Sequence, residues 1–218
     1  MTCKLLVLAT SAAFTLPLAA ANPDTPKLHP VEAVCIDYEQ SGQMQSGTST
    51  RCHRDFGYEQ YEISELTIGM AGFSQSQSNF TVTIGDTIYA IDTAANTATQ
   101  TVNPMYQGLA DAVDQSGSDA VSASFLSAMG MTPTGQTQTI IGMTCNVYSS
   151  NMMGSACLTT DGLMLEQTVM GTQMIATSVS YDAGDAENYR RHESATIRQG
   201  PDLSNGLSGL SDFLGQGN

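Results

Sequence analysis

The chain has 218 residues, no tryptophan and a formal net charge of −14, with 21 acidic residues against seven Lys and Arg. Between residues 56 and 189 there are 13 acidic residues but no Lys, Arg or His. Because nucleic-acid binding requires clustered cations, this distribution excludes a nucleic-acid-binding protein and disfavours electrostatic docking on anionic lipids. The acidity favours solubility, and it is also compatible with a partner that has a basic surface.

The first 30 residues predict an export signal followed by a linker. Lys4 supplies a positive start, residues 5–18 are mainly apolar, and Ala19–Ala21 forms a small-residue cleavage site. We therefore expect residues 1–21 to be removed and residues 22–30, which contain three prolines, to form a linker. Because the apolar stretch is too short to span a bilayer, we expect no transmembrane segment in the mature protein. Its expected location is the periplasm, with secretion from the cell as the alternative.

Four cysteines lie beyond the signal. In an oxidising compartment four cysteines indicate two disulfides, for which three connectivities are open. Their spacing favours sequential pairing across two hairpins, Cys35 with Cys52 and Cys145 with Cys157. Neither pair has the spacing of a redox motif or a zinc site, so we expect structural disulfides and no metal.

Period-two alternation predicts four strands in the first half of the chain, at Tyr61–Ile68, Phe80–Ile84, Ile88–Ile91 and Thr97–Val102. Gly85–Asp86 separates the second strand from the third. Gly and Asp tolerate the positive φ angles of a tight turn, so these two strands are expected to form a hairpin.

Two short helices are predicted next. Asn103 suits an N-cap and Pro104 suits the first helical position. Apolar residues then recur at helical spacing in two stripes, Met105, Leu109, Ala112 and Val113 followed by Val121, Phe125, Ala128 and Met129.

Strands resume after the helices, at Gln136–Tyr148, Ser155–Thr160, Leu163–Val169 and Gln173–Tyr181. The order of strands, helical pair and strands predicts a mainly β (α+β) domain over residues 31–190. We expect an antiparallel sheet with the helical pair on one face rather than alternating parallel units.

Residues 191–218 are expected to form a flexible tail. Within it four leucines recur at helical spacing, Leu203, Leu207, Leu210 and Leu214. Gly206 and Gly209 weaken a free helix there. The segment is therefore either frayed or ordered only when it docks on its own domain or on a partner.

Two blocks of sequence carry a family resemblance. One is Ile84–Asp92 followed by Thr97–Thr101 and Asn103–Met105, and the other is Ile141–Tyr148 followed by Cys157–Leu158 and Gly162–Glu166. Together they resemble uncharacterised exported bacterial proteins whose fold is similar to the LolA-type lipoprotein carrier. The resemblance spans about residues 31–181. It implies a curved, incompletely closed antiparallel barrel, with helices over its mouth and an acyl chain or hydrophobic segment bound inside.

Eleven of the 12 methionines lie beyond the signal. Methionine is flexible and polarisable and suits an adaptable apolar groove, although the plainer interpretation is core filling. The residues expected to contact an apolar ligand come from the helical pair and the later strands, and they are Met105, Leu109, Phe125, Met129, Met164, Met170 and Met174.

The sequence contains no nucleophile elbow, phosphate-binding loop or zinc-protease motif. We therefore expect no enzymatic activity and no cofactor. The leading hypothesis is a binding protein for a lipid or another hydrophobic ligand. The alternative is a structural or interaction protein that engages a protein partner through its acidic surface or through residues 191–218.

Overall fold

The computed structural model describes residues 25–70, 73–103, 106–118, 126–127, 130–150 and 154–201. The predicted signal and most of the predicted tail lie outside these residues. So do three of the candidate ligand contacts, Met105, Phe125 and Met129. Their roles stay predictions.

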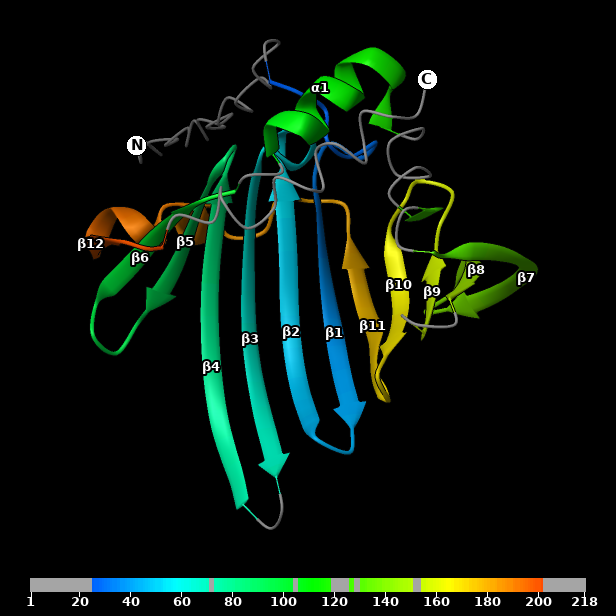
Figure 1. Cartoon of the computed structure of the whole chain (residues 1–218), viewed down its shortest axis with the longest axis horizontal. Coiled ribbons are helices and arrows are strands. Elements are labelled where there is room, and N and C mark those ends of the chain that lie inside the picture. Colours follow the sequence, from blue (N-terminus) through cyan, green and yellow to red (C-terminus); the bar gives the residue numbers. More distant parts are fainter. Residues whose placement is uncertain are drawn as a thin grey trace, which may run out of the picture.

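The described residues form one mixed sheet of 12 strands, in the order β12-β6-β5-β4-β3-β2-β1-β11-β10-β9-β8-β7. The strands are β1 (Val34–Gly42), β2 (Gln45–Arg54), β3 (Glu59–Met70), β4 (Phe73–Ile84), β5 (Thr87–Asp92), β6 (Thr97–Val102), β7 (Thr132–Ile140), β8 (Met143–Ser150), β9 (Gly154–Leu158), β10 (Met164–Val169), β11 (Thr172–Ser180) and β12 (Thr196–Gln199). The sheet curves without closing into a barrel, which confirms the expected fold class (Figure 1).

The helices are short. They are α1 (Tyr106–Ser116), α3 (Ala186–Tyr189) and the 3-10 turns η1 (Asp55–Gly57) and η2 (Arg191–Ser194). The first helix of the expected pair is α1, which lies beyond the upper ends of β1–β3 in Figure 1. The second lies largely outside the described residues. Within the described part of the chain, no helix is long and apolar enough to cross a membrane.

One predicted strand proves to be a hairpin. The segment Gln136–Tyr148 reverses at Ile141 and Gly142, whose φ angles of 47° and 81° place both in the left-handed region. The β7 and β8 strands therefore pair with each other, with Ile140 opposite Met143. Ile141 conceals the reversal in the sequence, because the first position of a tight turn with positive φ is usually Gly, Asn or Asp.

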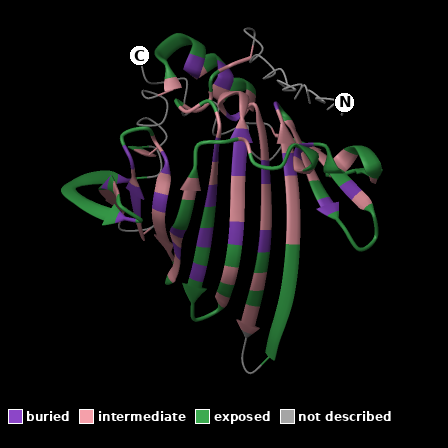
Figure 2. Ribbon diagram, turned by 180° about the vertical axis from the view of Figure 1, so that it is seen from behind, coloured by how far each residue is buried: buried purple, intermediate pink, exposed green. Residues whose placement is uncertain are grey.

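The boundary of the predicted tail also needs correction. Residues 191–199 form η2 and β12, and β12 pairs in parallel with β6, with Thr196 opposite Thr97. To reach that edge the chain crosses the sheet after β11. In Figure 1 this orange segment passes behind the strands, and Figure 2 shows it lying across them. The segment is held there by Tyr189, which is fully buried.

Strand register divides the central sheet into two faces. Val34, Ile36 and Tyr38 of β1 lie on the face toward which β7–β10 curve, which we call the inner face. On it they join a cluster with residues of the later strands and of the loop before β10, Cys145, Cys157, Leu163, Leu165, Met174 and Ala176. The opposite, outer face holds a second cluster, composed of Cys52, Tyr61, Val82, Ile91, Ala98 and Tyr189. Bands of buried and less buried residues along the strands reflect this alternation (Figure 2).

Both predicted disulfides are present. Cys35 and Cys52 are directly opposite in the β1–β2 hairpin, with a Cα–Cα distance of 4.1 Å. Cys145 and Cys157 join β8 to β9 across 5.4 Å. Two disulfides indicate an oxidising, extracytoplasmic compartment.

Candidate binding site on the inner face

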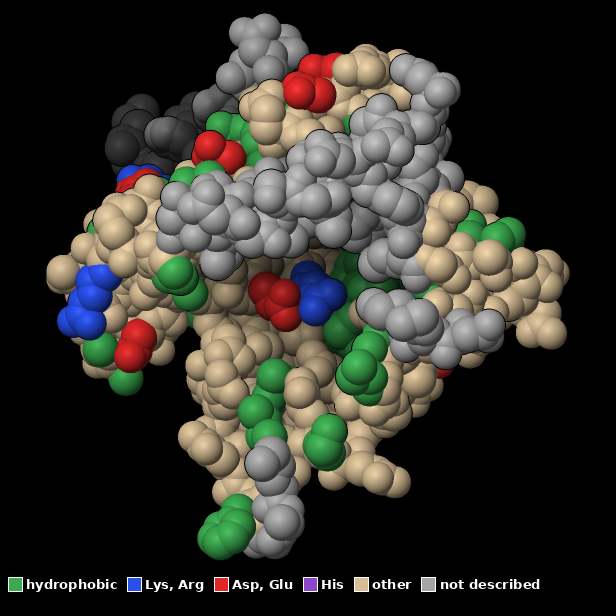
Figure 3. Space-filling model, viewed as in Figure 1, with side chains coloured by type: hydrophobic (Ala, Val, Ile, Leu, Met, Phe, Trp, Pro, Cys, Tyr) green, Lys and Arg blue, Asp and Glu red, His purple; other side chains and the backbone are tan. Residues whose placement is uncertain are grey.

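The inner face contains a cavity of about 280 Å³ between β1–β4 and the loop that precedes β10. Its lining residues are His29, Val34, Ile36, Tyr38, Arg51, Cys52, His53, Gln60, Tyr61, Glu62, Thr81, Thr83, Gly162, Leu163 and Met164. Cys52 and Tyr61 border the cavity, although they belong to the outer-face cluster. Figure 3 shows this face hollowed at its centre, with one basic and one acidic side chain side by side among mostly uncharged ones.

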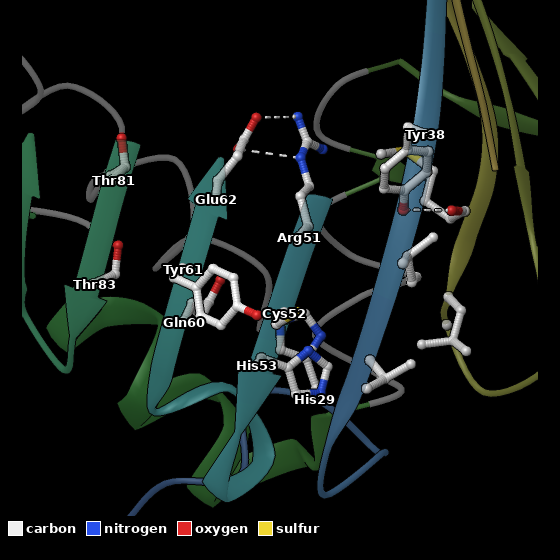
Figure 4. A pocket seen from close by; sticks show the side chains of 15 residues that line it. His29, Tyr38, Arg51, Cys52, His53, Gln60, Tyr61, Glu62, Thr81 and Thr83 are labelled. Carbon is white, nitrogen blue, oxygen red and sulfur yellow. Dashed lines mark hydrogen bonds and ion pairs between the residues drawn. The ribbon is translucent and has the colours of Figure 1, made fainter. Parts of the chain in front are cut away.

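Two rows of cross-strand neighbours build the floor of the cavity. Ile36, Arg51, Glu62 and Thr81 form one row across β1–β4, and Val34, His53, Gln60 and Thr83 form the next. Directly opposed residues point to the same side of a sheet, so each row presents its side chains together. Figure 4 shows the polar members projecting from neighbouring strands.

Arg51 and Glu62 form the charged pair of the cavity. The Arg51 Nη2 donates to Glu62 Oε1 at 3.3 Å, and Arg51 Nε lies 3.1 Å from Glu62 Oε2 without hydrogen-bond geometry. The Arg51 guanidinium also lies 5.5 Å from the centre of the Tyr38 ring. Because both charged side chains are about 40% exposed and their alignment is imperfect, the pair contributes little to stability and keeps donors available to a ligand.

Tyr38 connects the floor to the opposite wall. Its hydroxyl donates to the backbone oxygen of Met164 at 2.8 Å. Burial raises the pKa of Tyr38 to about 12, and the nearby Arg51 charge opposes that rise. The phenol therefore stays protonated and fixes the Met164 loop against β1.

Two histidines close the end of the cavity. The rings of His29 and His53 stack with centroids 4.6 Å apart, and His53 Nε2 lies 3.0 Å from the Val31 carbonyl oxygen. Burial, with a smaller contribution from the His53 charge, lowers the pKa of His29 to about 4. Burial also lowers the pKa of His53. Both rings are therefore neutral at pH 7, and part of the predicted linker is packed on the domain.

An apolar wall faces these polar groups. Val34, Ile36 and Leu163 belong to the inner-face cluster, and Met164 packs against it. The cavity is therefore amphipathic, with hydrocarbon on the β1 and β10 side and hydroxyl, amide and charged groups on the β3 and β4 side. Among the described residues, no group of three or more His, Cys, Asp or Glu side chains is placed to hold a metal ion.

The structure separates the predicted ligand contacts. Met164 lines the cavity. Met174 is buried within the inner-face cluster, so it fills the core. Met170 lies in the turn between β10 and β11 and is 88% exposed, which leaves it away from the cavity. Leu109 lies half-buried on α1 and is not among the cavity residues.

Sequence reasoning missed the polar half of the cavity. The β2–β3 register places Arg51 beside Glu62, and His29, which precedes β1, stacks on His53 through tertiary packing. The available signal was the pairing of Cys35 with Cys52. That pairing fixes the β1–β2 register and so places Arg51 beside Ile36 on the inner face.

No family model and no curated protein matches the chain. Among solved structures, an uncharacterized conserved protein from Thermus thermophilus is similar with a TM-score of 0.47 and 7% identity, covering 77% of this chain and 90% of that one. MucB, solved in complex with MucA(peri), has a TM-score of 0.37 and 15% identity, covering 73% of this chain and 53% of that one. The chain thus spans about half the length of that MucB chain. Neither likeness is strong enough to transfer a function.

Proposed function

We propose that the protein is a non-enzymatic extracytoplasmic binding protein that takes an amphipathic, lipid-like ligand in the inner-face cavity. The observation that carries this proposal is the division of the cavity into an apolar wall and a polar floor. The disulfides support the compartment.

The apolar wall suits a hydrocarbon chain. Ile36, Leu163 and Met164 present aliphatic and thioether groups, which offer a ligand no strong hydrogen-bonding group. The cavity volume of about 280 Å³ is close to the lower end of small-molecule sites, which begin at roughly 300 Å³. It therefore accommodates one part of a lipid, and the remainder would lie outside it along the inner face.

The polar floor suits an oxygen-rich headgroup. Arg51 has five N–H donors, and Glu62 accepts from only some of them. The hydroxyls of Thr81 and Thr83 lie on β4, beside the strand that carries Glu62. A carboxylate or ester oxygen could accept from these groups. A ligand of this type satisfies both walls at once, whereas a wholly apolar ligand would leave Arg51 desolvated.

The pairing of the cavity residues supports binding rather than catalysis. Glu62 is held by Arg51, His53 lies against a backbone carbonyl, and Tyr38 donates to Met164. These contacts fix the side chains in position. None of them links a nucleophile to a base, which is the arrangement that covalent catalysis requires.

Palmitate titrated calorimetrically into the delipidated protein tests the proposal. We expect Met164→Glu to weaken binding at least tenfold, because it places a carboxylate in the apolar wall. Met170→Glu is the matched control, because the same substitution lies outside the cavity, and it should bind like the unmodified protein. Absence of palmitate binding to the unmodified protein, or equal losses in the two folded variants, would contradict the proposal.

A further inference from the structure

We infer that one end of the sheet docks on a bilayer of zwitterionic lipids through three hairpin turns. These are the turns between β1 and β2, between β3 and β4, and between β10 and β11, which lie at the lower end of the strands in Figure 1. The inference goes beyond the proposed function, because docking needs no ligand in the cavity.

Each of these turns presents an exposed apolar side chain. Met44 is 62% exposed, Phe73 is 83% exposed and Met170 is 88% exposed. Single exposed apolar residues are common on protein surfaces, whereas a group of them marks a surface that contacts a membrane or another protein. The meaning of these three therefore depends on whether they lie together.

The three turns are neighbours in the sheet. The Gly69 amide of β3 donates to the Met44 carbonyl at 2.9 Å, which joins the β1–β2 turn to the β3–β4 hairpin. Gly42 lies opposite Thr172, which joins the same turn to β11. The exposed apolar side chains thus lie along the ends of adjacent strands, in the order β4-β3-β2-β1-β11-β10.

An acidic row marks where this end of the sheet begins. Glu39 and Glu166 both lie opposite Ile175, and Glu39 lies opposite Thr48, which in turn lies opposite Glu65. Beyond this row the described residues contain no Asp, Glu, Lys, Arg or His. They are residues 40–47, 66–70, 73–77 and 167–174, which we call the neutral end.

The neutral end has the depth that a bilayer interface requires. β1 continues from Glu39 to Gly42 and β3 continues from Glu65 to Met70, which at about 3.4 Å per residue is about 10 Å and about 17 Å. Interfacial protein segments enter the boundary between headgroups and acyl chains by roughly 5–10 Å. The turns can therefore enter this boundary while the acidic row stays in water, and no charged group loses its hydration.

The charge of the chain selects zwitterionic lipids. Its net charge of −14 and the acidic row oppose an anionic membrane, and the neutral end has no cation to offset that repulsion. Its Ser, Thr and Gln side chains supply hydrogen-bonding groups for lipid headgroups. On the face drawn in Figure 3, the lower part shows hydrophobic and other uncharged side chains.

The arrangement of the apolar side chains favours a bilayer over a protein partner. They stand on separate turns, with Gly, Ser and Gln residues between them, and do not form one continuous patch. A protein partner binds such anchors in matched, well-packed pockets. A fluid bilayer admits separated side chains without a matching pocket.

Flotation with phosphatidylcholine vesicles tests the inference on the protein with both disulfides intact. We expect the unmodified protein to float, and Phe73→Asp to lower the bound fraction about fivefold, because it places a carboxylate at the interface. Met170→Glu, which should leave palmitate binding unchanged, is expected to lower the bound fraction as well. Tyr181→Asp is the matched control, because Tyr181 is an exposed aromatic residue beyond the opposite end of β11. It should float like the unmodified protein.

A tryptophan reporter locates the contact, because the chain has no tryptophan of its own. We expect the emission of Phe73→Trp to shift to the blue when phosphatidylcholine vesicles are added, and brominated phosphatidylcholine to quench it. Tyr181→Trp should show neither change.

The outcomes separate the alternatives. Failure of the unmodified protein to float overturns the inference, and so does an equal loss in folded Phe73→Asp and Tyr181→Asp. Binding that increases with phosphatidylglycerol content also overturns it, because basic residues elsewhere would then carry the contact. A blue shift of Phe73→Trp that depends on protein concentration without vesicles assigns the turns to a second copy and likewise overturns it. Palmitate binding by a Phe73→Asp variant is expected whether or not the protein floats, so loss of palmitate binding with normal flotation rejects the proposed function alone.

Discussion

The two faces of the central strands differ in how completely other parts of the chain cover them. On the outer face, Tyr61, Val82 and the Cys35–Cys52 disulfide are covered by the segment that crosses from β11 to β12, and Tyr189 is fully buried among them. On the inner face, the same strands present Arg51, Glu62 and two threonines to a cavity. The outer face is therefore a packed core, whereas the inner face keeps polar groups with unused hydrogen-bonding capacity.

This difference shows that a sheet face is buried only where another segment of the chain packs against it. The outer face receives one from the crossing segment, whose Tyr189 packs edge-on against Tyr61 at 4.9 Å between centroids. The inner face is covered by the curvature of β7–β10 at one side. We therefore expect outer-face substitutions to change stability and inner-face substitutions to change binding and pH dependence.

The largest effect is expected for Tyr189→Ala. It removes a buried ring, the stacking of Arg54 at 4.2 Å from that ring, and the hydroxyl bond to the Ala183 carbonyl. We expect the free energy of unfolding to fall by about 3–5 kcal/mol. Chemical denaturation measures this change. Tyr181→Ala, at an exposed tyrosine of the same crossing, should cost less than about 0.5 kcal/mol, and similar losses for both would remove the contrast between the faces.

The inner-face histidines should make stability fall in mild acid. Because burial lowers the pKa of folded His29 from 6.5 to about 4, the unfolded chain takes up the proton first as the pH decreases. The contribution is present above pH 6.5 and is lost toward pH 4. Between pH 7 and 5 it amounts to about 2 kcal/mol, and His53 adds to it in the same direction.

Unfolding measured across this pH range tests that expectation. His29→Gln should flatten the dependence, whereas His192→Gln, at a histidine stacked on Tyr89 of the outer face, should keep it. An unchanged slope in His29→Gln would show that the stacked pair does not carry the effect.

The smallest effect sharpens the description of the outer face. Gly184 has φ +64°, and a Cβ there would lie 2.5 Å from Tyr61 Oη and 2.6 Å from Cys35 Sγ. Gly171 has a similar φ of +79° but no atom within 4 Å of such a Cβ. Gly184→Ala should therefore lower the free energy of unfolding by roughly 1 kcal/mol more than Gly171→Ala. Equal losses would mean that backbone strain alone accounts for the lower stability of both variants. The outer face would then accommodate the added methyl group of Gly184→Ala without cost.

The sequence predicted the fold better than the site. Strand positions and both disulfides follow from local patterns, because alternation and turn residues act over a few positions. The strand β12 has only four residues, Thr196–Gln199, with no alternation to mark it, and it is fixed by β6 and Tyr189 instead. The cavity depends on register across β1–β4 and on the curvature of the sheet. Methionine content therefore indicated Met174, which packs in the core, and gave no indication of Arg51 or His53.

The parallel pairing of β12 with β6 also sets an order of assembly. Thr196 meets Thr97 only after nearly the whole chain has been synthesised, because the crossing segment and β11 come first. Until then the N–H and C=O groups along β6 form an open edge that another extended chain could pair with. Contacts between such distant residues are slow to form. A chain interrupted before residue 196 would therefore be the form most prone to edge-to-edge aggregation, even though its central hairpins and both disulfides could already be in place.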